Sequence, residues 1–306
     1  MIDERTNLQK EKVIELLNKS SPNLLTEFPI DNYISTLRSY PSLTHYNYID
    51  QGISKIISNI DKVHGSINLE RYNQLLLVTL IQEISYQKDF QNLPEEVKSL
   101  IESNLNKIIK KLEGGQDGNG YYLNGNDKFQ KDLSISLLRM IPLGAQKVTL
   151  GKLSRGFLVK GGLNQFISGI GTIIFEIGGF GPIYHMHMDS RDRELVMEFN
   201  QNGWIRFYKR LAELLKINSE IKGVTGSSWF FDPVLEKISP ELNYLRETAF
   251  QCGGKIFYMG PSKGAVKDAT FMSPKRLKLY KEGSYKPSNY IVVISRNKLI
   301  KWASKS

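Results

Sequence analysis

The sequence is poor in cysteine and in long apolar runs. Cys252 is the only cysteine in the chain, so neither an internal disulfide nor a Cys-rich zinc site can form, and the composition fits a reducing compartment. No uncharged apolar run reaches the roughly 18 residues of a membrane-spanning helix. The nearest, residues 166–180, contains Glu176. The N-terminus MIDERTNLQKEK is charged where a signal peptide needs an apolar core. We expect a soluble, cytoplasmic chain without a spanning helix.

Acidic residues are scarce at the C-terminal end. Residues 255–306 hold twelve Lys or Arg and two acidic residues, so this segment accounts for the formal net charge of +10. It could meet an anion, namely a phosphorylated cofactor, nucleic acid or an anionic membrane, or it could be an ordinary solvated surface. Because Phe257 and residues 290–294 are too apolar to leave in water, we expect the segment to be folded.

Helical patterns fill the first third of the chain. Apolar residues recur at helical spacing in residues 6–17, 49–63, 69–86 and 95–112. We predict a helical region over residues 1–113, in which His45 and His64 are surface or packing residues. Glycine and asparagine dominate residues 114–127, GGQDGNGYYLNGND, which predicts an exposed connection. A hairpin or a ligand loop is the alternative, because NG pairs flank Tyr121 and Tyr122.

Residues 128–306 alternate strand and helix patterns. Residues 161–177 read as a buried helix with several glycines. The following order is strand GPIYHMHMD, an amphipathic helix at 203–216, strand IKGVTG, an aromatic turn with short helix starts, and strands at 255–259 and 290–294. This order predicts an α/β (α+β) domain with a mixed, partly parallel sheet. Gly169 and Gly171 do not open a dinucleotide fingerprint, because Ile174 stands where the third glycine belongs.

His185, His187 and Asp189 alternate along the first of these strands, so they share one face. Two histidines and a carboxylate can complete a divalent metal site of the kind that hydrolases and oxygenases use. The pattern resembles the HxD pair of jelly-roll iron oxygenases, which also place a histidine further downstream, and no histidine follows His187. The same residues could act without a metal, with an imidazole as general base and Asp189 fixing its tautomer. We favour the second interpretation.

The turn GSSWFFDP places hydroxyls and aromatic rings just beyond a strand, where open α/β sheets bind ligands. Ser227, Ser228 and Trp229 are therefore candidate substrate-binding residues. No G-x-S-x-G elbow surrounds either serine, which argues against a nucleophile. The alternative is that the aromatic rings pack under the sheet while Asp232 caps a helix.

The strand and helix order over residues 181–294 resembles the later half of the GNAT acyltransferase superfamily. In that family the helix after the central strand begins with an R/Q-x-x-G-x-G/A loop whose amides hold the acyl-CoA pyrophosphate. The corresponding residues here are Asn200 to Ile205, of which Gly203 matches. The resemblance implies an acyl-CoA or related donor with its phosphates near Asn202 and Gly203. The strings SSWFFDP and SYKPSNYIVV also resemble strings in bacterial proteins of unassigned function.

Three function classes follow from these patterns. The first is a small-molecule acyltransferase, for which the helix start at Asn202 and Gly203 receives phosphate. The second is a metal-dependent hydrolase or oxygenase that uses His185, His187 and Asp189. The third is a protein that binds nucleic acid or an anionic membrane through its basic C-terminal segment. We take the first as the leading hypothesis.

Overall fold

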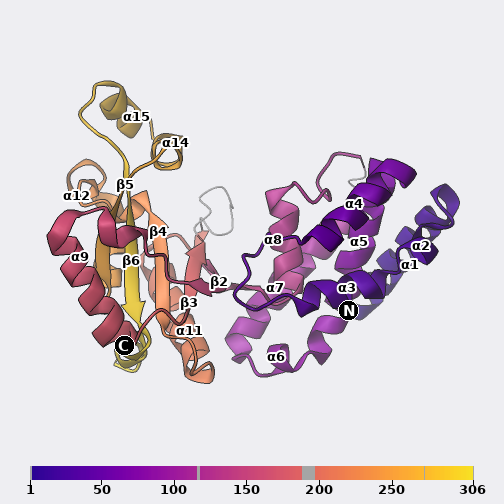
Figure 1. Cartoon of the computed structure of the whole chain (residues 1–306), viewed down its shortest axis with the longest axis horizontal. Coiled ribbons are helices and arrows are strands. Elements are labelled where there is room, and N and C mark those ends of the chain that lie inside the picture. The colour runs from indigo at the N-terminus through magenta and orange to yellow at the C-terminus, as the bar shows by residue number, and fades with distance from the viewer. Residues whose placement is uncertain (1, 116–117, 188–196, 272, 306) are drawn as a thin grey trace. The chain divides into compact units, whose positions relative to one another are not determined.

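The computed structural model describes residues 2–115, 118–187, 197–271 and 273–305 (Figure 1). The chain is an α+β protein, as the sequence predicts, and divides into two compact units, Met1–Pro142 and Leu143–Ser306. None of the helices in the described ranges has the length and apolar character needed to cross a membrane.

The first unit is helical, and α5 is its centre. Helices α1, α3, α4, α7 and α8 pack around α5. Residues 68–81 of α5 are buried with one exception, which explains why this helix is apolar on nearly every side. The elements are α1 (Ile2–Ser20), α2 (Leu24–Glu27), α3 (Ile30–Ser39), α4 (Gln51–His64), α5 (Ser66–Glu83), η1 (Ile84–Tyr86), α6 (Lys88–Gln91), α7 (Glu95–Glu113), α8 (Asp127–Ser136) and β1 (Met140–Pro142).

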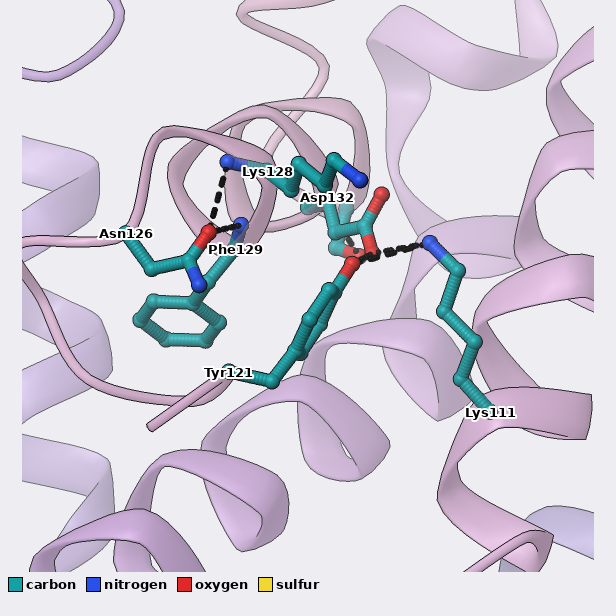
Figure 2. Close-up of polar contacts among 7 residues, drawn as sticks. Lys111, Tyr121, Asn126, Lys128, Phe129 and Asp132 are labelled. Carbon is teal, nitrogen blue, oxygen red and sulfur yellow. Dashed lines mark hydrogen bonds and ion pairs between the residues drawn. The ribbon is translucent and has the colours of Figure 1, made fainter. Parts of the chain in front are cut away.

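The glycine-rich segment predicted as a connection lies within the first unit. Tyr122 is buried, and its carbonyl accepts a hydrogen bond from Asn73 Nδ2 on α5. The Tyr121 hydroxyl and Lys111 Nζ lie 2.6 and 2.8 Å from Asp132 Oδ2 on α8. Figure 2 shows the two side chains converging on this carboxylate. The division of the chain therefore falls at 142/143 and not at 114–127, because these anchors fasten the segment and α8 to the helical unit.

A mixed sheet forms the second unit. Within this unit the strand order is β2-β3-β4-β6-β5, and β3 and β4 are parallel while β2–β3, β4–β6 and β5–β6 are antiparallel. The elements are β2 (Lys147–Lys152), η2 (Gly156–Val159), α9 (Gly162–Gly171), η3 (Thr172–Ile177), β3 (Pro182–His187), α11 (Gln201–Ile217), β4 (Gly223–Ser228), η4 (Trp229–Phe231), α12 (Leu235–Ile238), η5 (Pro240–Leu242), α13 (Tyr244–Gln251), β5 (Lys255–Pro261), α14 (Lys263–Phe271), α15 (Pro274–Lys281), β6 (Ser288–Ser295) and α16 (Arg296–Ala303).

Helices cover both faces of this sheet. On one face α11 lies with α13 and α16, and Asn218 Nδ2 after α11 donates to the Tyr184 hydroxyl on β3. On the other face, η2 and the continuous helix α9–η3 cover a core that includes Ile183, Phe257 and Val293. The basic C-terminal segment is folded, as predicted, since β6 lies between β4 and β5.

One sequence prediction fails on this second face. Residues 162–177 form the predicted helix, with its last turns widened into a π-helix, but the helix is not buried. Only its inner side, including Gly169, Ile173 and Ile177, is buried. Its outer side exposes Leu163, Ile167 and other large apolar residues. An apolar pattern predicts burial only where the fold supplies a covering element on both sides.

Candidate functional site

Three strands of the second unit end at the same edge of the sheet. β3 is parallel to β4, and β6 is antiparallel to both β4 and β5, so β3, β4 and β5 run in one direction. Their last residues are His187, Ser228 and Pro261. We call this the carboxyl edge. Sheets with parallel strands bind ligands at such an edge, where the strand order changes direction.

The parallel pairing stops before the strands do. Tyr184 pairs with Val224 and His185 with Thr225, but β3 continues to His187 and β4 to Ser228. The last residues of both strands thus lie outside the β3–β4 ladder, and among them Ser227 is exposed while Met186, Gly226 and Ser228 are buried. Beside them, Met186 fills the space over Gly226, since a Cβ at Gly226 would lie 2.6 Å from Met186 Cε.

His185 is held against the neighbouring strand. Its Nε2 lies 3.0 Å from the carbonyl oxygen of Lys152 at the end of β2. A carbonyl only accepts, so Nε2 donates and the neutral ring has Nδ1 as its basic nitrogen. The ring lies over Gly151, where an added Cβ would come within 2.9 Å of it. A larger residue at position 151 would displace the imidazole.

His187 is positioned by a residue that the sequence did not single out. Thr149 on β2 is buried, and its Oγ1 lies 2.7 Å from His187 Nε2. A hydroxyl can donate or accept, so this contact fits either tautomer. Thr149 could be found only from the strand register, which pairs it with His185. Asp189, the predicted third member of the set, lies outside the described residues.

The three candidate residues of the aromatic turn have different environments. Ser227 is exposed, and the register places it on the sheet face that His185 and Thr225 share. Ser228 is buried, and its Oγ accepts from the Phe230 amide at 3.2 Å. Trp229 is also buried and packs against Phe230, with ring centroids 4.2 Å apart. Ser227 is therefore the one of the three that a ligand can reach directly.

A buried arginine lies over the same turn. The Arg276 guanidinium stands 4.9 Å from the centre of the Trp229 ring. Its Nε donates to the Ala269 carbonyl and its Nη1 to Ser239 Oγ. Desolvation by burial lowers the pKa of Arg276. Arg276 therefore fastens α15 to the aromatic turn beside the carboxyl edge. The sequence alone did not distinguish Arg276 from the other basic residues of this segment.

The geometry of the first turn of α11 explains why a glycine occupies position 203. Its amide donates to Asn200 Oδ1 at 3.0 Å, which is the N-cap bond of the helix. A Cβ at position 203 would lie 2.0 Å from the Glu198 carbonyl oxygen, so only glycine fits. A phosphate at this amide would compete with the cap. Asn202 is exposed in the same turn, and the helix N-terminus favours anions there.

A cationic arm stands beyond the carboxyl edge. Helices α14 and α15 connect β5 to β6, and Figure 1 shows them past the ends of these strands. The arm has one acidic residue, Asp268, within its helices. Its cations are Lys263, Lys267, Lys275, Arg276, Lys278 and Lys281. A cluster of charges of one sign produces a positive potential, which favours anions over cations at this edge.

The described residues do not assemble a metal centre. Within the parts of the chain that the structure describes, no three His, Cys, Asp or Glu side chains form a group that could hold a metal ion. His185 and His187 are instead bonded to Lys152 and Thr149. Because Asp189 lies outside these parts, the full predicted triad is not tested.

Comparison of the chain with protein-family models, with curated proteins and with solved structures found no match. The resemblances to GNAT acyltransferases and to bacterial proteins of unassigned function therefore stay predictions from the sequence.

Proposed function

We propose that the second unit is a small-molecule acyltransferase of GNAT-like architecture that uses acyl-CoA or a related acyl donor. The observation that carries the proposal is the carboxyl edge, where the β3–β4 ladder stops before the strands end. Candidate bases on β3 and the cationic arm lie at the same edge. Helix α11 connects the end of β3 to the start of β4, so its N-terminus also faces this edge.

The donor is expected to bind across this edge. Its thioester arm would lie along the ends of β3 and β4 on the face where Ser227 is exposed. Its phosphates would lie by the first turn of α11 at Asn202 and near the lysines of the arm. Gly203 contributes mainly as the residue that lets this turn pack on Glu198, because its amide is engaged by Asn200.

The histidines supply the proton chemistry of the proposal. An amine or hydroxyl of the acceptor attacks the thioester carbonyl carbon while His187 or His185 takes its proton. The tetrahedral intermediate then collapses, the C–S bond breaks, and the thiolate leaves and takes the proton from the imidazolium, which restores the neutral histidine. Ser227, exposed on the same face, is placed to bind the acceptor. Thr149 and the Lys152 carbonyl hold the two imidazoles during these steps.

Thiol release tests the proposal. The purified chain is incubated with acetyl-CoA or longer acyl-CoAs and a panel of amines and alcohols, and free CoA thiol is measured. We expect His187→Ala to lower kcat/KM by about 10²–10⁴-fold if His187 is the base, and acyl-CoA to raise the melting temperature. The matched control is His45→Ala, which removes an exposed histidine bonded to Asn47 in the first unit.

Three results would change the assignment. The acyltransferase is rejected if acyl-CoA neither protects the chain against heat nor releases thiol with any acceptor. Equal activity of wild type, His185→Ala and His187→Ala removes the histidines from the mechanism. Bound metal that is lost together with activity in these variants would favour the hydrolase or oxygenase.

A further inference from the structure

The outer side of the α9–η3 helix is an exposed apolar surface. Leu163 is 72% exposed and Ile167 is 62% exposed, and Ile174 and Phe175, which is 85% exposed, continue the surface along the helix. Leu163, Ile167 and Ile174 are spaced i, i+4 and i+11, which places them on one side of a helix. Val159 precedes them and is exposed as well. We call these five residues the apolar stripe.

The stripe is presented on a rigid base. Gly169 lets the helix approach η2, since an added Cβ would come within 2.6 Å of Leu158 Cδ2. Ile173 and Ile177 are buried in the core under the sheet. The helix therefore cannot turn its stripe inward without losing this packing. Contiguous exposed apolar surface on a fixed element marks an interaction site more often than a packing defect.

The charged residues next to the stripe in the sequence are mostly positive. Lys152, Arg155 and Lys160 are exposed in the segment that leads into it. Glu176 is the only acidic residue between positions 152 and 187. Its two carboxylate oxygens each lie 2.7 Å from a lysine, Lys255 or Lys298, so its charge is compensated. Lys152, Arg155 and Lys160 thus give the stripe a cationic border, and the one carboxylate of this part of the sequence is paired with lysines.

We propose that the α9–η3 helix binds an anionic lipid surface, with the apolar stripe inserted at the headgroup boundary and the cationic border contacting lipid phosphates. An apolar helix side bordered by Lys and Arg has the character of interfacial helices that lie in the membrane plane. A second copy of the chain is a poorer occupant, because it would bring one cationic border against another. This inference does not depend on the acyl-transfer proposal.

Vesicle sedimentation with the full chain tests the proposal. Vesicles of phosphatidylcholine with phosphatidylglycerol are compared with phosphatidylcholine alone. We expect binding to the anionic vesicles that weakens with added salt. The double variant Leu163→Ser/Ile167→Ser should lower the partition coefficient by at least about 10-fold. Its control is Leu8→Ser/Val63→Ser, which removes two apolar side chains of 64% and 67% exposure in the first unit and should bind like wild type.

The cationic border is tested separately. Arg155→Glu/Lys160→Glu should lower binding to anionic vesicles by about 10-fold or more. Lys55→Glu/Lys62→Glu makes the same change in net charge on exposed residues of α4 and should have a much smaller effect. Failure of the wild type to bind anionic vesicles overturns the proposal. So does equal binding by the stripe variant and its control, or a self-association that the stripe variant abolishes without any vesicle binding.

Discussion

Gly203 shows how one residue can be required by a neighbouring backbone. It lies in the first turn of α11, where most residues would be accepted. The Glu198 carbonyl oxygen occupies the position that a side chain needs, at 2.0 Å from an added Cβ. The same glycine donates the N-cap bond to Asn200. Gly203 is the residue that matches the GNAT loop, but the packing of this helix turn by itself also requires a glycine at this position.

We predict that Gly203→Ala destabilises the second unit. The carbonyl cannot move without the backbone, so the overpacking should lower the free energy of unfolding by about 1–3 kcal/mol despite the helix propensity of alanine. Urea unfolding measures the change. Gly171→Ala is the control, because nothing lies within 4 Å of its added Cβ and it should gain a few tenths of a kcal/mol. An unchanged midpoint for Gly203→Ala would contradict the steric argument.

The sequence predicted which way the side chains of β3 point at the candidate site, but it did not predict which residues they contact. Alternation along a strand correctly placed His185 and His187 on one face with Met186 on the other. Thr149 could not be identified, because its contact with His187 depends on which residues of β2 face β3. The register between two strands that are distant in the sequence cannot be deduced from the local pattern of either strand. The aromatic turn followed the alternative interpretation for Trp229, which packs against its neighbours.

At the scale of elements, Glu176 joins three parts of the second unit. It lies in η3 and pairs with Lys255 of β5 and Lys298 of α16. Desolvation alone would raise the pKa of its carboxyl, but the hydrogen bonds from the two lysines outweigh desolvation and lower it. A lowered pKa in the folded state means that the interaction stabilises the fold when Glu176 is ionised.

We predict that Glu176→Gln costs about 0.5–1 kcal/mol of unfolding free energy near neutral pH, the range of partly exposed ion pairs. This loss of unfolding free energy should be complete at pH values above 4.5, the ordinary pKa of a glutamate. It should disappear as the pH falls through the lower pKa that Glu176 has in the folded protein. Urea unfolding across this range measures it. Glu220→Gln, at an exposed residue, is the control. A loss that is independent of pH would show that the charge of Glu176 is not responsible.

Element order was largely predictable from apolar spacing, whereas element burial was not. The expected helices at residues 49–63, 69–86 and 95–112 correspond to α4, α5 with η1, and α7. A Ser-Pro pair favours a helix start, and Ser273 caps α15, since its Oγ accepts from the Arg276 amide. The α9–η3 helix was predicted to be buried because its sequence is apolar on most sides. Periodicity reports the amphipathicity of a segment but not what covers each side.

At the scale of the whole chain, the two units have separate cores. The first has α5 at its centre, and the second packs helices on both faces of its sheet. The sequence predicted a helical region followed by a mixed-sheet domain. It set the boundary by the density of turn residues, which identifies a loop but not the unit to which the loop is bonded. The loop belongs to the helical unit because of long-range contacts, which involve Tyr121, Tyr122 and Asp132.

We predict that residues 1–142 unfold cooperatively as a fragment, whereas residues 1–113 do not. The shorter fragment loses Tyr122 and three buried apolar residues of α8, namely Phe129, Leu133 and Ile135. At about 2 kcal/mol for each buried side chain, this loss approaches the whole stability of a small domain. It also leaves Lys111 without Asp132. Urea unfolding followed by circular dichroism compares the fragments, with residues 143–306 as the complementary control. A sharp transition at the same midpoint for both N-terminal fragments would instead place the boundary at residues 114–127, because it would show that the glycine-rich segment and α8 add nothing to the helical core.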